Sequence, residues 1–240
     1  MKMFQRTIIS PNPAQFPGPN LIQMDLTALN QPPVPSSDLP RSIRYLALGD
    51  SYTIGEAVPE EERWPNQLAR LLRSYHLKTE VTIIARTGWT TDELWAGIRD
   101  RQIQPPYDLV SLLIGVNNQY RGWGIDVYEG EFRFLVEKSI EYAGGNPRKV
   151  IVLSIPDWGV TPFASDRNQP KIASEVDAFN AVNREETERA GASYVDITPY
   201  SRFAAVSPSL VAEDGLHPSG KMYAGWAEMA LGAARKALGK

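Results

Sequence analysis

The residue types that acyl transfer needs occur at two places far apart in this chain. Ser51 ends the stretch ALGDS and offers a hydroxyl that can act as a nucleophile. His217, in the stretch DGLHP, is one of only two histidines and can accept the proton of that hydroxyl. Asp214 lies three residues before His217 and can hold the imidazole by its other ring nitrogen. Together these side chains have the chemistry of a Ser-His-Asp triad.

Acyl transfer also needs hydrogen-bond donors for the oxyanion that develops in the transition state. Candidate donors are the backbone N–H of Ser51, the backbone N–H of Gly88 and the side-chain amide of Asn117. Asp50 is expected to hydrogen-bond locally and to order the loop around Ser51. Taken singly, each of these residues is an ordinary helix-cap or turn residue. Their joint placement after successive predicted strands favours a site.

The elements that must position these residues alternate between strand and helix. Short apolar runs typical of buried strands lie at 42–49, 81–85, 108–115, 149–156 and 192–197. Helices are predicted at about 64–75, 90–102, 126–143, 171–190 and 218–238. This alternation predicts an α/β protein, a three-layer α/β/α sandwich with a five-stranded parallel sheet. The residues after each strand should then meet at one edge of the sheet.

Composition bounds the class of protein. The chain has 240 residues, 42% of them hydrophobic, a formal net charge of −3 and no cysteine. A near-neutral balance offers no basic stripe for a nucleic acid, and the lack of cysteine excludes disulfides and thiolate metal sites. No apolar run approaches the ~20 residues that a membrane span needs. We therefore expect no nucleic-acid partner, no membrane span, no metal and no cofactor.

The first 42 residues differ from the rest, because prolines repeatedly interrupt them. We interpret residues 1–42 as a Pro-rich N-terminal extension and residues 43–240 as one domain. The start of the chain carries positive charge without the sustained apolar segment of a signal peptide, so a cytoplasmic location is expected. The oligomeric state and the role of the extension stay open.

Four blocks, GDSYTIGE (49–56), TGWTTDEL (87–94), GVNNQY (115–120) and DGLHPS (214–219), carry a resemblance to a known family. The chain resembles the SGNH hydrolases, also called the GDSL esterase/lipase family, over residues 43–238. The resemblance implies a flavodoxin-like fold, an SGNH/GDSL hydrolase domain over 43–240, and functional roles for the residues that match the family pattern: Ser51, Gly88, Asn117, His217 and Asp214.

Two departures from the family pattern matter. Tyr52, Thr53 and Ile54 follow Ser51 where many relatives carry leucine, which leaves the preferred substrate open. Where the family usually has aspartate in its third block, this chain has Asn118, while the catalytic amide of Asn117 is intact. The Gly-x-Ser-x-Gly elbow of α/β-hydrolases is absent, because position 53 is threonine. We therefore expect activity to survive on the SGNH fold and leave the effect of Asn118 open.

The leading functional prediction is a serine esterase that hydrolyses carboxylic esters of small or medium acyl groups, with a small-molecule ester as its partner. Tyr120, Trp158 and Ile54 are predicted to contact the substrate. One alternative is a carbohydrate O-deacetylase, in which Trp89, Trp123 or Trp158 stacks on sugar rings.

Two further alternatives stay open. A thioesterase or lysophospholipase would need an apolar groove, for which Ile54, Leu94, Phe163 and Tyr120 are available. A different class is a non-catalytic or flavin-binding flavodoxin-like protein. The chain lacks a Ser/Thr-rich phosphate loop after its first strand, which speaks against the flavin alternative.

Overall fold

The computed structural model describes residues 41–240, whose five strands form one sheet. The predicted extension, residues 1–42, lies outside the described residues except for its last two positions, which begin the first strand. The strands are β1 (Arg41–Gly49), β2 (Leu77–Ala85), β3 (Leu109–Leu113), β4 (Val150–Leu153) and β5 (Ser193–Val195). All neighbouring strands pair in parallel, in the order β2-β1-β3-β4-β5. This is the flavodoxin-like order, and the predicted fold class is confirmed.

The central strands are apolar because both of their faces are covered. Every residue of β3 (LVSLL) and β4 (VIVL) is buried. Parallel sheets that lie between two helical layers have continuous apolar strands of this kind. The hydrophobic core is therefore centred on β3, β4 and the middle of β1.

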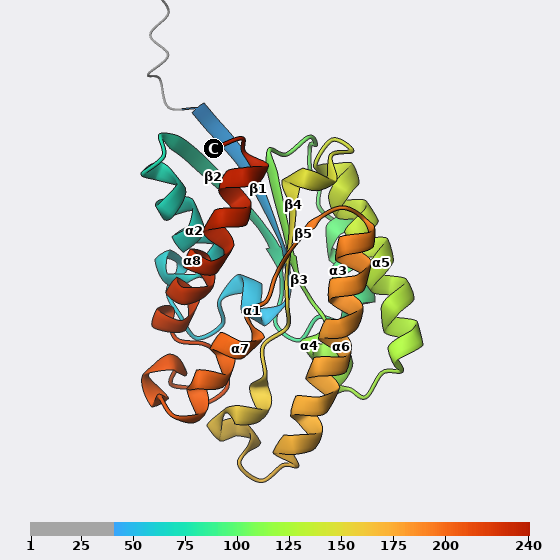
Figure 1. Ribbon diagram of the computed structural model, residues 1–240, viewed down its shortest axis with the longest axis vertical. Helices are drawn as coiled ribbons and strands as arrows, with labels where there is room; N and C mark the ends of the chain where they lie inside the picture. The colour runs from blue at the N-terminus through green and yellow to red at the C-terminus, as the bar shows by residue number, and fades with distance from the viewer. Residues whose placement is uncertain (1–40) are drawn as a thin grey trace, which may run out of the picture. The chain divides into compact units, whose positions relative to one another are not determined.

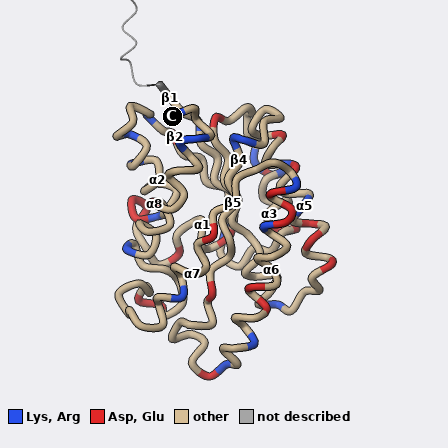
Figure 2. Tube along the Cα trace, viewed as in Figure 1, with Lys and Arg blue, Asp and Glu red and all other residues tan. Residues whose placement is uncertain are grey.

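Two helical layers sandwich the sheet (Figure 1). One face is covered by α2 (Trp64–Arg73) and α8 (Gly220–Ala237), the other by α3 (Thr91–Arg99), α5 (Ile125–Tyr142) and α6 (Gln169–Arg189). Figure 2 shows lysines, arginines and acidic residues on the outer helices and loops, while the middle of the sheet carries none. The fold is thus the expected three-layer sandwich.

The sequence pattern does not predict the short helices of the structure, because each spans only a turn or so. They are α1 (Ser51–Ile54), α4 (Val116–Tyr120), α7 (Thr198–Ser201) and the 3₁₀ segments Glu60–Glu62, Pro147–Lys149, Trp158–Val160, Pro162–Ala164, Arg202–Ala205 and Pro208–Leu210. β2 is also longer than predicted, because it begins at Leu77 rather than at residue 81. Burial alternates over residues 77–80, so this part of the strand lacks the continuous apolar run on which the prediction was based. Four of these short elements, α1, α4, Trp158–Val160 and Pro162–Ala164, contribute residues to the lining of the candidate site.

Candidate active site

Ser51 lies directly after β1, at the first position of α1. The Asp50 carboxylate caps this short helix by accepting a hydrogen bond from Tyr52 N–H at 3.0 Å. The turn needs glycine at position 49, because a Cβ there would overlap the Thr53 side chain. Within residues 41–240, the Ser51 N–H donates to no acceptor. This N–H group is therefore available to the oxyanion that forms on a substrate carbonyl oxygen when the Ser51 hydroxyl attacks.

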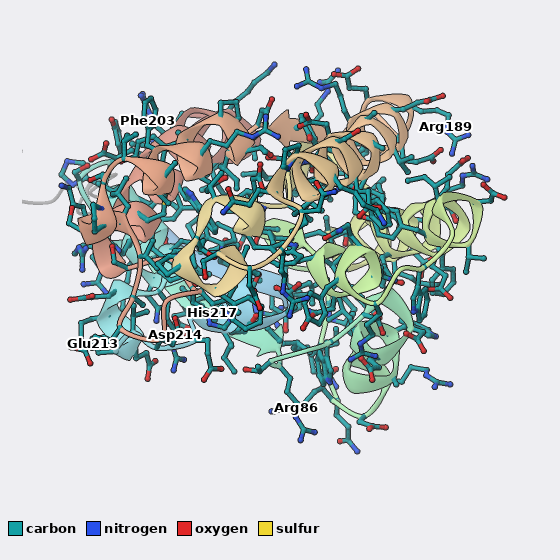
Figure 3. All side chains as sticks on the ribbon, turned by 90° about the horizontal axis from the view of Figure 1, so that it is seen from below. Arg86, Arg189, Phe203, Glu213, Asp214 and His217 are labelled. Carbon is teal, nitrogen blue, oxygen red and sulfur yellow. The ribbon has the colours of Figure 1, made fainter. Side chains whose placement is uncertain are left out.

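Asp214 and His217 form an acid–base pair within one turn before α8 (Figure 3). Asp214 Oδ2 lies 2.6 Å from His217 Nδ1, while Oδ1 accepts the backbone N–H groups of Leu216 and His217, both at 2.9 Å. Partial burial opposes ionisation of Asp214, but these hydrogen bonds outweigh it and hold the pKa of the carboxyl below its usual value. With Nδ1 donating to Asp214, His217 Nε2 is left as the basic nitrogen.

The His217 ring is held in place by its surroundings. It is 7% exposed, and its centroid lies 5.3 Å from that of the Tyr52 ring. The backbone on both sides is also anchored: Ala212 N–H donates to His217 O at 2.8 Å, and Ser219 N–H donates to Leu210 O at 2.9 Å. The fold therefore fixes the orientation of the imidazole before substrate arrives.

The other two candidate oxyanion donors, Gly88 and Asn117, lie in the loop after β2 and on α4. Gly88 has a φ of +84°, a left-handed conformation that favours glycine. Its N–H donates to no acceptor among the described residues. Asn117 Nδ2 donates to Trp89 O at 2.9 Å, and an Arg121 guanidinium nitrogen donates to Gly88 O at 2.7 Å and pairs with Glu93 at 3.2 Å. α4 thus holds the Gly88 loop beside Ser51.

Asp50 places a fully buried carboxyl beside the nucleophile. Burial raises the pKa of Asp50 to about 7, although hydrogen bonds from Tyr52 N–H and, at 3.3 Å, from Asn117 Nδ2 favour its ionised form. The carboxyl therefore orders the loop, as expected from the sequence, and also contacts a candidate oxyanion donor.

Asn118, the residue that departs from the family pattern, is fully buried and holds the start of α3. Its Oδ1 accepts Thr91 N–H at 3.2 Å, and its Nδ2 donates to Thr91 Oγ1 at 2.7 Å. The Thr91 hydroxyl in turn donates to Glu131 of α5. The Thr91 hydroxyl thus accepts from the Asn118 amide and donates to the Glu131 carboxylate.

A pocket of about 180 Å³ opens onto these groups. Its lining contains the candidate nucleophile, the candidate base, two candidate oxyanion donors and an apolar wall: Ser51, Tyr52, Thr87, Gly88, Val116, Asn117, Tyr120, Trp158, Phe163, Leu216 and His217. Within residues 41–240 the Ser51 hydroxyl makes no hydrogen bond to His217. In unliganded enzymes such catalytic hydrogen bonds are often long and shorten when substrate binds.

Tyr120, Trp158 and Phe163 form the aromatic wall of this pocket. Their ring centroids lie 5.3 to 6.4 Å apart. Trp158 Nε1 donates to Gln119 at 2.8 Å, and Phe163 N–H donates to Gly215 O at 2.9 Å. The wall is therefore hydrogen-bonded to the turn that carries Asp214 and His217.

The structure brings together all the predicted catalytic and oxyanion residues, and it places Tyr120 and Trp158 in the same pocket. Ile54 is half-buried and does not line that pocket, nor do Leu94, Trp89 and Trp123. Sequence reasoning missed Arg121 and the packing of Tyr52 on His217. Both depend on tertiary contacts. The one signal in the sequence is that Arg121 and Tyr52 lie close to the GVNN and GDS blocks.

The chain is similar to one protein family and to several solved structures. The family model described as GDSL-like lipase/acylhydrolase matches residues 47–224. No match was found among curated proteins. Similar solved structures include TesA (16% identity, TM-score 0.63, covering 81% of this chain and 99% of that one).

Two further structural neighbours are esterases by name. The acetylxylan esterase Axe2 from Geobacillus stearothermophilus is 19% identical, with a TM-score of 0.62 over 85% of this chain and 97% of that one. The psychrotrophic esterase EstA from Pseudoalteromonas sp. is 17% identical, with a TM-score of 0.60 over 82% and 99%. At these identities, the similarity establishes the fold.

Proposed function

This chain belongs to the GDSL-like lipase/acylhydrolase family, and we propose that it hydrolyses carboxylic esters of small or medium acyl groups through a serine acyl-enzyme. Family membership makes the protein an ester-bond hydrolase and removes the flavin-binding alternative. No helix within residues 41–240 has the length and apolar character to cross a membrane. The proposal concerns the residues that act and the size of the acyl group.

In the proposed reaction, Ser51 Oγ attacks the ester carbonyl carbon while His217 Nε2 takes the hydroxyl proton. The N–H groups of Ser51 and Gly88 stabilise the resulting oxyanion, and the Asn117 amide joins them by releasing its hydrogen bond to Asp50, the longer of its two at 3.3 Å. Collapse of this intermediate breaks the bond to the alcohol, which leaves with the proton held by His217. A water molecule, deprotonated by His217, then attacks the acyl-enzyme and releases the acid and free Ser51.

The observation that carries this proposal is the Asp214–His217 pair at 2.6 Å, which opens onto the pocket that Ser51 also lines. Asp214 stabilises the imidazolium that forms when His217 takes the serine proton. His217 differs from an ordinary surface histidine in three ways. It is only 7% exposed, it is hydrogen-bonded to a carboxylate and it packs on Tyr52.

The test is Ser51→Ala assayed on p-nitrophenyl acetate, for which we expect kcat to fall by roughly 10⁴-fold or more. Ser74→Ala is the matched control, because Ser74 is exposed at the end of α2 and its hydroxyl bonds only the Leu71 carbonyl within residues 41–240. Retention of most activity by Ser51→Ala would rule out the mechanism. Far-UV circular dichroism of both variants excludes loss of folding.

The size of the pocket supports a short or medium acyl group. Its volume of about 180 Å³ is below the ~300–1,000 Å³ typical of pockets for drug-sized ligands. A series of p-nitrophenyl esters from C2 to C16 should therefore give its highest kcat/KM at the short end. A maximum at C12 or longer would favour the thioesterase or lysophospholipase alternative.

A carbohydrate O-deacetylase is the second candidate, favoured by the exposed aromatic rings of the pocket wall. Tyr120 and Phe163 are 45% and 39% exposed, so they have free faces, whereas Trp158 is 4% exposed. Sugar stacking would thus fall on Tyr120 and Phe163 rather than on the tryptophans. Release of acetate from acetylated xylan at a kcat/KM above that of p-nitrophenyl acetate would favour this candidate.

A further inference from the structure

Arg167 lies against all three rings of the aromatic wall. Its guanidinium carbon is 5.3 Å from the Tyr120 ring centroid, 5.6 Å from that of Trp158 and 5.2 Å from that of Phe163. All three distances fall within the ~6 Å range in which an aromatic face attracts a cation. The rings that line the Ser51 pocket therefore also hold a positive charge beside it.

This charge has no acidic partner within residues 41–240. Among the described residues, the Arg167 guanidinium donates one hydrogen bond, to the Tyr120 hydroxyl at 3.3 Å. Arg121, Arg184 and Arg202, by contrast, each pair with a carboxylate. Most of the donors of the Arg167 guanidinium are therefore free to bind an external group.

The pocket itself adds nothing that would repel an anion at this position. None of its lining residues is acidic. The nearby carboxylate of Asp214 is hydrogen-bonded to His217, and that of Glu56 accepts the Thr87 hydroxyl. The planar, multi-donor guanidinium of arginine suits two-point binding of a carboxylate.

We propose that Arg167 binds an anionic group of the substrate, so that the enzyme favours esters that carry a carboxylate or a similar oxyanion. This inference rests on the proposed function, because it assigns a substrate class to the same site. The anion can belong to the acyl group or to the alcohol, since both lie in the pocket during the reaction. In either case it would sit at the end formed by Tyr120, Trp158 and Phe163.

The experiment compares charged esters with neutral ones of nearly equal size. The acyl arm uses the 4-nitrophenyl monoester of adipic acid and its methyl-capped analogue. The alcohol arm uses 4-acetoxybenzoate and its methyl ester. In the arm that matches the natural substrate, Arg167→Gln should lower kcat/KM for the anionic ester by about 10- to 100-fold, mainly through KM, because a charge-assisted hydrogen bond is lost. The neutral ester should change by less than about threefold.

Two further variants separate charge recognition from packing. Arg167→Lys keeps the charge and should retain part of the preference for the anionic ester. Arg86→Gln is the matched control: Arg86 is exposed, forms no ion pair in the described part of the chain and points outward in Figure 3. It should leave the ratio of the two rates unchanged. The preference should also weaken as salt rises.

Equal effects of Arg167→Gln on the anionic and neutral esters in both arms would overturn the inference. So would the same loss of preference in Arg86→Gln, because it would indicate a general effect of net charge. Neither result touches the serine mechanism, which is tested separately by the loss of neutral-ester hydrolysis in Ser51→Ala.

Discussion

Asn117 and Arg121, four residues apart at α4, donate hydrogen bonds to two consecutive carbonyl groups, those of Trp89 and Gly88. Residues at this spacing lie on the same face of a helix. One helical face therefore fixes the loop that presents the Gly88 N–H, and Asn117 is itself an oxyanion donor in the proposed mechanism. The distance between the Gly88 N–H and the Asn117 amide is thus set by hydrogen bonds to the Trp89 and Gly88 carbonyl groups.

Asn117→Ala should lower kcat by about 10²–10³-fold, as expected when one oxyanion donor is removed. Arg121→Gln should lower kcat by about 10-fold with little change in KM, because it loosens the loop without touching substrate. The double variant should lose less than the product of the two effects, since both act on the same loop. Strict multiplication of the effects in steady-state assays would show that Arg121 acts independently.

Asp214→Asn should reduce kcat by roughly 10⁴-fold while leaving the fold intact, because an amide neither holds the required imidazole tautomer nor stabilises imidazolium. Assays on p-nitrophenyl acetate at pH 7 to 8 measure this effect. Glu213→Gln is the matched control, since Glu213 is the exposed neighbour of Asp214 (Figure 3). A decrease of less than about 10-fold in Asp214→Asn would remove Asp214 from the triad.

The buried carboxyl of Asp50 should make the free energy of unfolding fall as pH rises. Its pKa is raised to about 7 in the folded protein by burial, whereas an unfolded aspartate has its ordinary value of 3.8. Below both values the group is protonated in both states and its stabilisation is fully present. As pH rises toward 7 the unfolded chain releases its proton first, so stability is lost through this window and levels off above it.

Asp50→Asn should remove this dependence, because asparagine keeps an acceptor for Tyr52 N–H and cannot ionise. Between pH 5 and 8 the wild type should lose on the order of 3 kcal/mol more than the variant, at roughly 1.4 kcal/mol per pKa unit. Urea unfolding of both proteins across this range provides the measurement. Parallel pH profiles for the two proteins would contradict the prediction.

Asn118→Asp should destabilise the protein by about 1–3 kcal/mol, because it sets a second carboxylate on the Thr91 hydroxyl, which has only one proton to donate. Glu131→Gln in the same chain should restore most of that loss, since glutamine can donate to Thr91 Oγ1 while the hydroxyl donates to the new aspartate. A double-mutant cycle in urea at pH 7 measures the coupling. Additive effects would show that Glu131 does not compensate for Asn118.

The layers of the fold and the members of the site could be predicted because they depend on local patterns. The apolar runs before Ser51 and Asn117 predicted strands, and parallel strands bring their carboxyl ends to one edge. The pairing of Asp214 with His217 followed from their spacing in one turn.

Other features depend on contacts that no sequence pattern reveals. The raised pKa of Asp50 results from burial by distant elements. The packing of Arg167 on the aromatic wall requires the loop after β4 to contact α4. The predicted substrate contact of Ile54 rested only on its nearness to Ser51 in the sequence, and Ile54 does not line the pocket. Burial and loop packing are tertiary properties. The candidate catalytic residues are therefore easier to predict from the sequence than the residues that surround them.

The Asn118–Thr91–Glu131 contact also has a consequence for how the sequence can diverge. Position 118 is on α4 and position 131 is on α5, yet both bond one hydroxyl. Aspartate at position 118 alone would leave that hydroxyl facing two carboxylates with one proton to donate. We therefore expect the identities at 118 and 131 to covary among relatives, with aspartate at 118 accompanied by a side chain other than glutamate at 131.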